Sequence, residues 1–219
     1  DVRLFSTATL SQCWITTHGA PYFLIALDAQ GKLLDTVSDL SQISASRSVH
    51  ISTSGSKVLV KQGNESFGTF HRLMLVPKSA QSHFIIKGSG RERIYSGTLL
   101  FRVYPSELQI INRVDLEEYV AGVVESEGGH YAQYEYFKAQ AVLARTWVLK
   151  NWDKHSKEGY NVRDDVSSQA YYSKAYLQYS DNILQAVLDT KDTILIDANG
   201  EAIFGAFHAN SGGETVNSE

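Results

Sequence analysis

The chain has 219 residues, of which 43% are hydrophobic and 20% are charged, a composition typical of a globular protein with ample material for a core. Its formal net charge of -4 argues against binding to nucleic acid, which normally requires a basic face. Cys13 is the only cysteine, so neither an intrachain disulfide nor a cysteine-rich zinc site can form, and no run reaches the ~18 apolar residues needed to cross a bilayer.

The part of the chain before Asn112 is predicted to be rich in β-structure. Tyr22–Leu27 and Leu33–Val37 flank a Gln30-Gly31 turn, which predicts a hairpin. Further strands are predicted at Lys57–Val60, Arg72–Val76, Phe84–Lys87, Gly97–Val103 and Leu108–Ile111. Short strands at this spacing, separated by turn residues, indicate a small sheet or a barrel-like unit.

After Asn112 the apolar residues follow a helical period. Asp115-Leu-Glu-Glu118 matches a capping box, with Asp115 as the N-cap and Glu118 reaching back to it. The apolar residues that follow share one helix face: Leu116, Tyr119, Val120, Val123 and Val124. Gly128-Gly129 is expected to end this helix.

Two more helices and a hairpin are predicted further along the chain. The longer helix runs roughly from Glu135 to Asp153, and a short one begins near Ser180. Thr193–Asp197 and Ala202–His208 form a hairpin that turns at Asn199-Gly200.

Helical geometry separates the acidic residues of the first helix. Eleven positions at ~100° each bring Glu127 to within about 20° of Leu116, on the apolar face, whereas Glu125 and Glu118 fall on the solvent side. A buried carboxylic acid has a raised pKa, and an acid that is still protonated near neutral pH can protonate a glycosidic oxygen. The alternative is that the helix ends before Glu127 and leaves its side chain in solvent.

The second helix carries two cations on one face. Lys138 and Arg145 are two turns apart, while Gln140 points elsewhere. A cation in a mostly apolar helix needs a partner, and a buried Glu127 would provide one. The alternative is that both side chains extend to water with their stems buried.

Several blocks of sequence, taken in order, carry a resemblance to a known family. They are Ser96-Gly-Thr-Leu, Ile111-Asn-Arg-Val-Asp-Leu-Glu-Glu118, Tyr119-Val-Ala-Gly-Val-Val-Glu-Ser-Glu127, Lys138-Ala-Gln-Ala-Val-Leu-Ala-Arg-Thr146, and Phe207-His-Ala-Asn-Ser-Gly-Gly213 with Thr215. From Ser96 to Thr215 the chain resembles the stage II sporulation protein D family, also called the SpoIID/LytB family, and the residues before Ser96 match it only weakly.

The resemblance implies a peptidoglycan lytic transglycosylase. Such an enzyme cleaves between N-acetylmuramic acid and N-acetylglucosamine in glycan strands stripped of their stem peptides, and it leaves a 1,6-anhydro sugar at the new end. The resemblance places the catalytic glutamate at Glu127 and a functionally important arginine at Arg145. Because the nucleophile is the substrate's own hydroxyl, one carboxyl group can donate a proton to the leaving oxygen and then accept one from the attacking hydroxyl. For Arg145 we expect a role in orienting Glu127 or binding sugar oxygens, since a cation against the developing positive charge would hinder the reaction.

The matching blocks also give the residues expected to bind the glycan. These are Lys138, Gln140, Asp164, Gln169, Tyr171, Ser211, Gly212 and Gly213. For Asp164, Gln169 and Tyr171 the alternative is hydrogen bonding within a loop. Many relatives carry Cys and His residues in this loop that can bind zinc, but Arg163, Ser167 and Ser168 stand there in this chain. No metal and no other cofactor are therefore predicted.

Two departures from the family pattern bear on activity. Relatives often have Met-Pro after the catalytic glutamate, where Gly128-Gly129 leaves the backbone here less constrained. The sequence stops at Glu219, where relatives normally continue, so the family-like region is expected to be truncated at its C-terminus.

The chain is thus expected to be an α+β protein. A β-rich N-terminal region covers residues 1–95, and a SpoIID-like catalytic region over residues 96–219 combines a helical segment with a C-terminal β-hairpin. The expected location is outside the cytoplasm, in the cell envelope or periplasm, with a leader or membrane anchor removed before Asp1. The expected partners are peptidoglycan glycan strands, and a cell-wall amidase is a further candidate.

Two other functions remain open at this point. The first is a non-catalytic peptidoglycan-binding module that enhances a cell-wall amidase. The second is an ordinary glycoside hydrolase in which Asp164 or Asp165 acts beside Glu127.

Overall fold

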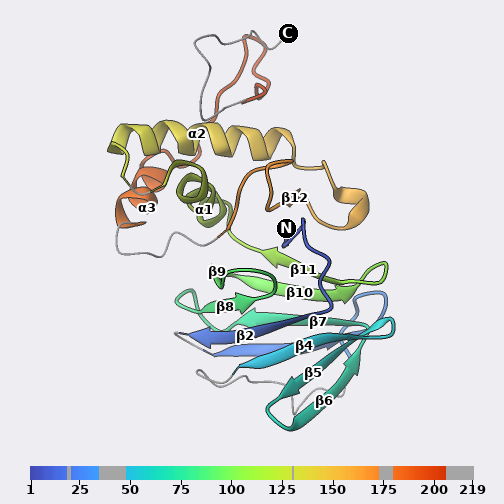
Figure 1. Ribbon diagram of the computed structural model, residues 1–219. Coiled ribbons are helices and arrows are strands. Elements are labelled where there is room, and N and C mark those ends of the chain that lie inside the picture. Colours follow the sequence, from blue (N-terminus) through green and yellow to red (C-terminus); the bar gives the residue numbers. More distant parts are fainter. Residues whose placement is uncertain (19–20, 35–47, 130, 173–179, 206–219) are drawn as a thin grey trace.

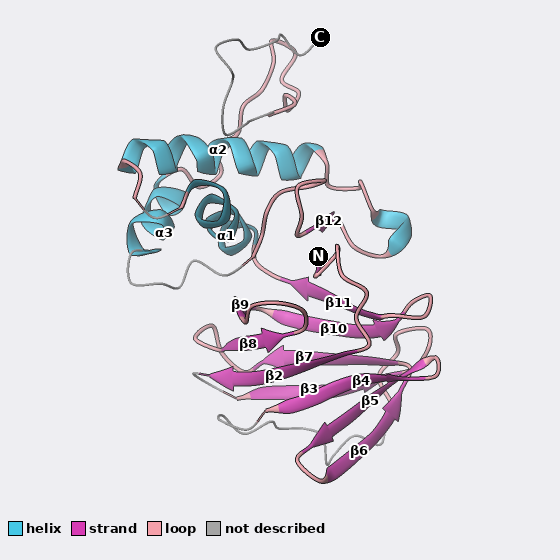
Figure 2. Cartoon of the chain, in the orientation of Figure 1, coloured by secondary structure: helices cyan, strands magenta, loops and turns pink. Residues whose placement is uncertain are grey.

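The computed structural model describes residues 1–18, 21–34, 48–129, 131–172 and 180–205. Over these ranges two six-stranded sheets pack face to face, and the helices stack together at one end of the sandwich (Figure 1). Figure 2 shows the separation between the strand-rich and helical parts. The predicted α+β class is confirmed.

The first sheet has the strand order β12-β1-β11-β10-β7-β3. Its neighbours are antiparallel except for β1 and β12, which run parallel. In sheet order the bounds are β12 (Val162–Arg163), β1 (Val2–Leu4), β11 (Leu108–Arg113), β10 (Thr98–Val103), β7 (Arg72–Pro77) and β3 (Tyr22–Leu27).

The second sheet has the strand order β6-β5-β4-β2-β8-β9, and all its neighbours are antiparallel. In sheet order the bounds are β6 (Glu65–Phe70), β5 (Lys57–Gln62), β4 (Val49–Ser54), β2 (Gln12–His18), β8 (His83–Lys87) and β9 (Arg93–Ser96). In β2, β4, β5 and β8 buried and more exposed side chains alternate, which places one face of the sheet on the core and leaves the other outside.

All the strands predicted between Lys57 and Ile111 are confirmed. The hairpin after β3 is confirmed as far as it is described: Gly31 has a φ of 89°, and Leu33 bridges Leu27. Residues 35–37 of its predicted second strand lie outside the described residues. Six strands were not predicted: β1, β2, β4, β6, β9 and β12.

The helices are α1 (Leu116–Gly128), α2 (Tyr134–Lys150), the short 3-10 helix η2 (Ser156–Glu158) and α3 (Ser180–Asp189). The predicted cap of α1 is confirmed, because the Asp115 carboxylate accepts hydrogen bonds from the backbone N–H groups of Glu117 and Glu118. The Glu118 carboxylate accepts a hydrogen bond from the Ser96 hydroxyl, so it ties the helix to β9.

The end of the described chain turns back as predicted. Ile196 bridges Ala202 in antiparallel register, and Gly200 takes a φ of 84° in the turn between them. Residues 206–208 of the predicted hairpin lie outside the described residues. The boundary predicted between residues 95 and 96 runs through the sandwich, because β10 pairs with β7 across it.

Candidate active site

Glu127 lies in the last turn of α1, just before the helix ends at Gly128. Gly129 follows with a φ of 66°, a left-handed conformation that glycine adopts without strain. The Glu127 side chain is exposed and Glu125 is buried, so the predicted burial of Glu127 and exposure of Glu125 are both wrong.

The packing of α1 explains this reversal. Both α2 and α3 pack against the helix, and every residue from Tyr119 to Glu125 is buried. Because seven consecutive residues are buried, this part of α1 is buried on all sides. It therefore has no single apolar face from which the burial of a given residue could be predicted. Leu116, the reference for the predicted face, is itself only partly buried. Glu127 is exposed because the helix emerges from this packing in its last turn.

The Glu127 carboxylate is fixed by the segment that follows β12. Its Oε1 atom accepts a hydrogen bond of 2.8 Å from the backbone N–H of Ala170. Next to it, the Ser126 hydroxyl oxygen accepts a 3.0 Å hydrogen bond from the backbone N–H of Tyr172. Burial first, and then the charge of Glu127, raise the pKa of Tyr119. Residues 170–172 therefore lie along the end of α1 and orient the carboxylate.

Buried side chains beneath this segment hold it in place. The Tyr119 hydroxyl donates to Gln169 Oε1 at 3.2 Å, and the Tyr171 hydroxyl donates to Asn112 Oδ1 at 3.2 Å. The Tyr95 hydroxyl donates to the Tyr171 carbonyl oxygen at 3.0 Å. Gln169 and Tyr171, predicted to bind the glycan, are thus occupied by contacts within the fold, as the loop alternative expected.

Asp164 anchors the beginning of the same segment. Its carboxylate accepts hydrogen bonds from the backbone N–H groups of Phe5 at 2.5 Å and Ser6 at 2.9 Å, and it pairs with the Arg93 guanidinium at 2.6 Å. The neighbouring Asp165 is also buried. Burial raises the pKa of Asp165, but hydrogen bonds from Ser167 and Ser6 outweigh it and hold the pKa below its usual range. Both carboxylates are engaged in structural contacts, which disfavours their predicted use beside Glu127 in a hydrolase.

Arg145 is buried, with 1% of its surface exposed, and its partner is Glu117. Two hydrogen bonds join the guanidinium to the two Glu117 oxygens, from Nε at 3.0 Å and from a terminal nitrogen at 2.5 Å. Two more reach the carbonyl oxygens of Thr193 at 3.0 Å and Val187 at 3.2 Å. The predicted pairing of Arg145 with Glu127 is therefore wrong, since Glu117 lies ten residues, or roughly 15 Å of helix, before Glu127.

The spacing of apolar residues in the sequence itself indicates that Glu117 is buried. Glu117 stands three and seven positions before Val120 and Val124, so it shares their face of the helix. Arg145 therefore holds α1, the helix that carries Glu127, and its predicted catalytic role stays a prediction.

The other predicted glycan-binding residues lie at the surface or outside the described chain. Lys138 is partly exposed, and its Nζ atom contacts Glu135 Oε1 at 3.3 Å. Gln140 is also partly exposed, on the middle of α2. Their role stays a prediction. Three more predicted residues lie outside the described residues: Ser211, Gly212 and Gly213.

Two exposed tyrosines border Glu127, and sequence reasoning did not find them. A Cβ atom added to Gly128 would lie 2.9 Å from a ring carbon of Tyr136, so this tyrosine packs directly against the residue after Glu127. Tyr172 is exposed beside the segment that orients Glu127, and its ring centroid is 5.1 Å from the Arg93 guanidinium. The Gly128-Gly129 departure from the family pattern thus has a structural counterpart, because the Tyr136 ring occupies the space of a side chain at Gly128.

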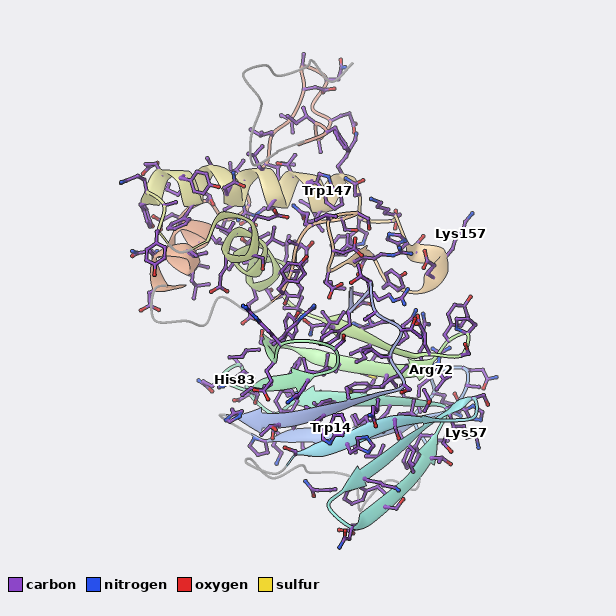
Figure 3. The ribbon with its side chains drawn as sticks, in the orientation of Figure 1. Trp14, Lys57, Arg72, His83, Trp147 and Lys157 are labelled. Atoms are coloured by element: carbon purple, nitrogen blue, oxygen red, sulfur yellow. The ribbon has the colours of Figure 1, made fainter. Side chains whose placement is uncertain are left out.

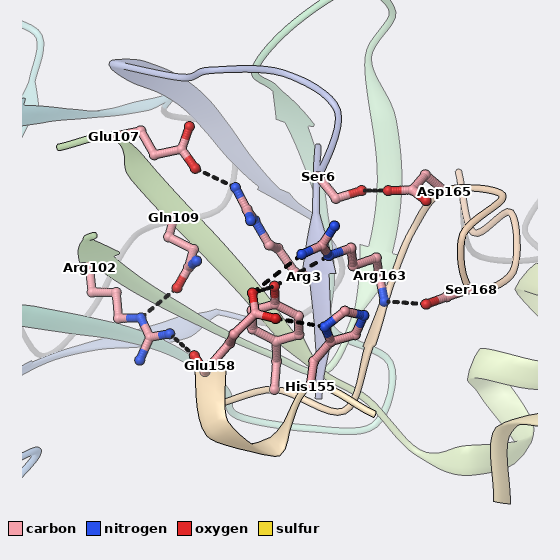
Figure 4. A network of polar contacts seen from close by, with 11 residues as sticks. Arg3, Ser6, Arg102, Glu107, Gln109, His155, Glu158, Arg163, Asp165 and Ser168 are labelled. Carbon is pink, nitrogen blue, oxygen red and sulfur yellow. Dashed lines mark hydrogen bonds and ion pairs between the residues drawn. The ribbon is translucent and has the colours of Figure 1, made fainter. Parts of the chain in front are cut away.

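A polar network holds the loop in which many relatives carry possible zinc ligands (Figure 4). Glu158 accepts hydrogen bonds from Tyr160 and from His155, which lower its pKa to about 2, and it pairs with Arg163 at 3.3 Å. The Arg163 backbone N–H donates to the Ser168 hydroxyl oxygen at 3.1 Å. In the part of the chain that the structure describes, no group of three or more His, Cys, Asp or Glu side chains is placed to hold a metal ion.

The family model of SpoIID, stage II sporulation protein, matches residues 104–196, the range that contains α1, α2 and the segment beside Glu127. Over these residues the chain is similar to the SpoIID family. Stage II sporulation protein D of Bacillus subtilis (strain 168) is 33% identical over 143 residues, which are 59% of this chain and 41% of that protein. The SpoIID match covers α1 through α3 and the bridge at Ile196.

Two other relatives give a similar result. Stage II sporulation protein D of Bacillus amyloliquefaciens is 32% identical over 157 residues, 65% of this chain and 45% of that protein. An uncharacterised protein of Brachyspira hyodysenteriae is 32% identical over 126 residues, 57% of this chain and 33% of that protein. The chain thus spans less than half the length of each of these three relatives. No solved structure matches the chain. None of the described helices is long and apolar enough to span a membrane.

Proposed function

We propose that this chain acts outside the cytoplasm as a peptidoglycan lytic transglycosylase, with Glu127 as its general acid and base. The observation that carries the proposal is the placement of Glu127, whose exposed carboxylate is oriented by the Ala170 backbone N–H. A catalytic carboxyl group must reach its substrate and must be held in one geometry, and Glu127 meets both conditions.

The proposed reaction needs one carboxyl group and no water. Protonated Glu127 gives its proton to the glycosidic oxygen as the bond from that oxygen to C1 of N-acetylmuramic acid breaks. The C6 hydroxyl of the same sugar then attacks C1 and closes the 1,6-anhydro ring, and its proton passes to the Glu127 carboxylate. The products are the anhydro end and a free 4-hydroxyl on N-acetylglucosamine, and the enzyme returns to its first state.

Because Glu127 is exposed, the bound substrate itself must shield the carboxyl group from water. In the free protein the carboxylate lies in water, so exclusion of water must come from the bound glycan strand. Tyr136 packs against Gly128 and the Tyr172 backbone contacts Ser126, and both tyrosine rings are exposed, so they are available to contact that strand near Glu127. Aromatic side chains with a polar hydroxyl suit the mixed surface of a sugar ring.

The test is the product formed from purified, peptide-free glycan strands. Mass spectrometry distinguishes anhydro ends from the reducing ends of a hydrolase, because hydrolysis adds one water. We expect Glu127→Gln to lower the rate of cleavage by about 10²- to 10⁴-fold. Glu65→Gln is the matched control, because Glu65 is an exposed glutamate on β6, away from the helices, and its replacement should leave the rate unchanged.

Other results would replace the proposal. Reducing ends would assign the chain to the hydrolases, and binding of strands without cleavage would assign it to the non-catalytic modules. Full activity in Glu127→Gln would show that the chemistry belongs to another residue.

A further inference from the structure

The outer face of the second sheet presents an ordered set of side chains that the proposed reaction does not use. Trp14 of β2 lies opposite His50 on β4 and opposite Lys87 on β8. Two residues along β2, Thr16 lies opposite Ile85. Because alternate residues of a strand point to the same face, these side chains form two adjacent cross-strand rows on the outside of the sandwich.

The two rows enclose a groove with a volume of about 360 Å³. This size is in the range of small-ligand sites. Trp14 stands in the groove with 39% of its surface exposed, and Figure 3 shows it on the sandwich, away from the helices. The lining residues are Trp14, Thr16, Ser48, Ile85, Lys87 and Glu92.

The Trp14 ring is held from one side. The His50 ring centroid lies 4.7 Å from it with a tilt of 35°, and the His50 Nε2 atom is 3.0 Å from Gln12 Oε1. Burial, and then the charge of Lys61, lower the pKa of His50, which favours the uncharged form of this ring. Trp14 also lines the groove, where its indole ring contributes apolar surface.

Apart from Ile85, the remaining lining residues are polar, and their formal charges sum to zero. The Thr16 and Ser48 hydroxyl oxygens lie 2.8 Å apart, and Lys87 Nζ lies 4.0 Å from Glu92 Oε1 with both side chains mostly exposed. One cation beside one anion gives no attraction for a polyanion or a polycation. An uncharged chain with apolar ring faces and with hydroxyl and amide groups at its edges matches such a lining.

We propose that this groove binds a saccharide chain, with Trp14 stacked on a sugar ring and the hydroxyl and charged groups hydrogen-bonded to its edges. The saccharide class follows from the lining of the groove. The choice of cell-wall glycan as the natural ligand rests on the proposed function. The groove would then hold a part of the glycan strand that lies away from the cleaved bond.

The test is the affinity of the full chain for peptide-free glycan strands and for soluble N-acetylglucosamine oligosaccharides, measured by calorimetry. Trp14→Ala should weaken binding by about tenfold or more, as for a central aromatic contact. Trp152→Ala is the matched control, since Trp152 is 45% exposed and lies outside the groove, and it should leave the affinity unchanged. Trp14→Phe keeps an aromatic ring and should retain most of the affinity, which guards against a fold defect in Trp14→Ala.

The outcomes separate the groove from Glu127. Equal binding by Trp14→Ala and the parent overturns the inference, and so does loss of binding in Glu127→Gln alone. Self-association that depends on Trp14, without binding to saccharide, would assign the groove to a second copy of the chain and also overturn it. A parent that binds through Trp14 but does not cleave retains the groove and removes the proposed function. If the parent cleaves glycan strands and Trp14→Ala binds them as well as the parent does, the proposed function stands and the inference about the groove is overturned.

Discussion

Replacement of Arg145 by methionine should destabilise the protein strongly, because the ion pair with Glu117 is buried. The change removes the two hydrogen bonds to the Glu117 carboxylate and the two to the carbonyl oxygens of Thr193 and Val187. It leaves the Glu117 charge buried without its partner, and losses of this kind cost about 3–5 kcal/mol. The whole free energy of unfolding of a domain is typically about 5–15 kcal/mol. Arg145→Met is therefore expected to remove a large share of the stability.

The assay is unfolding in urea, followed by fluorescence and circular dichroism, with a double-mutant cycle. Glu117→Leu with Arg145→Met removes both charges and should recover much of the loss, since an apolar pair of similar volume avoids the buried charge. Cleavage of glycan strands is measured on each variant at a temperature where it is folded. If Arg145 acts only by positioning α1, the double variant regains part of its activity together with its stability.

One result would refute this reasoning. A fully stable but inactive Arg145→Met protein would mean that the guanidinium acts on the substrate directly. The buried pair with Glu117 would then not be the reason for the arginine.

Two further predictions concern Gly128 and Glu158. Gly128→Ala places a Cβ atom 2.9 Å from the Tyr136 ring, so the ring must move. The free energy of unfolding should change by less than about 1 kcal/mol, because alanine favours the helix. The rate of glycan cleavage should fall if the Tyr136 ring contacts the strand. Unchanged kcat/KM in this variant would remove Tyr136 from the site. The pKa of Glu158 is lowered from 4.5 to about 2, so its contribution to stability is complete above pH 4.5 and is lost as the pH falls towards 2. Thermal melts between pH 5 and pH 2 should show a smaller loss for Glu158→Gln than for the parent; parallel losses would contradict the assignment.

The sequence alone determined the local structure well where short-range rules apply. Asp115 was identified as a cap because an aspartate before a helix can bind the free N–H groups of its first turn, and the structure has those bonds. Gly128-Gly129 was identified as the end of α1, since Gly129 can adopt a positive φ. The turns at Gly55 and Gly63 carried the same kind of signal and would have predicted the hairpins that join β4, β5 and β6.

Tertiary packing decided the surroundings of the candidate site. Sequence periodicity assumes that a helix has one buried face, but α1 is covered by α2 and α3 along its middle, which buried Glu125 and left Glu127 at the open end. The partner of Arg145 lies 28 residues away, and only the crossing of α1 and α2 determines that it is Glu117. The helix cap and the glycine stop depend on neighbours in sequence, whereas burial and pairing depend on which elements meet in space. For that reason the sequence could identify Glu127, and only the structure could show what holds it.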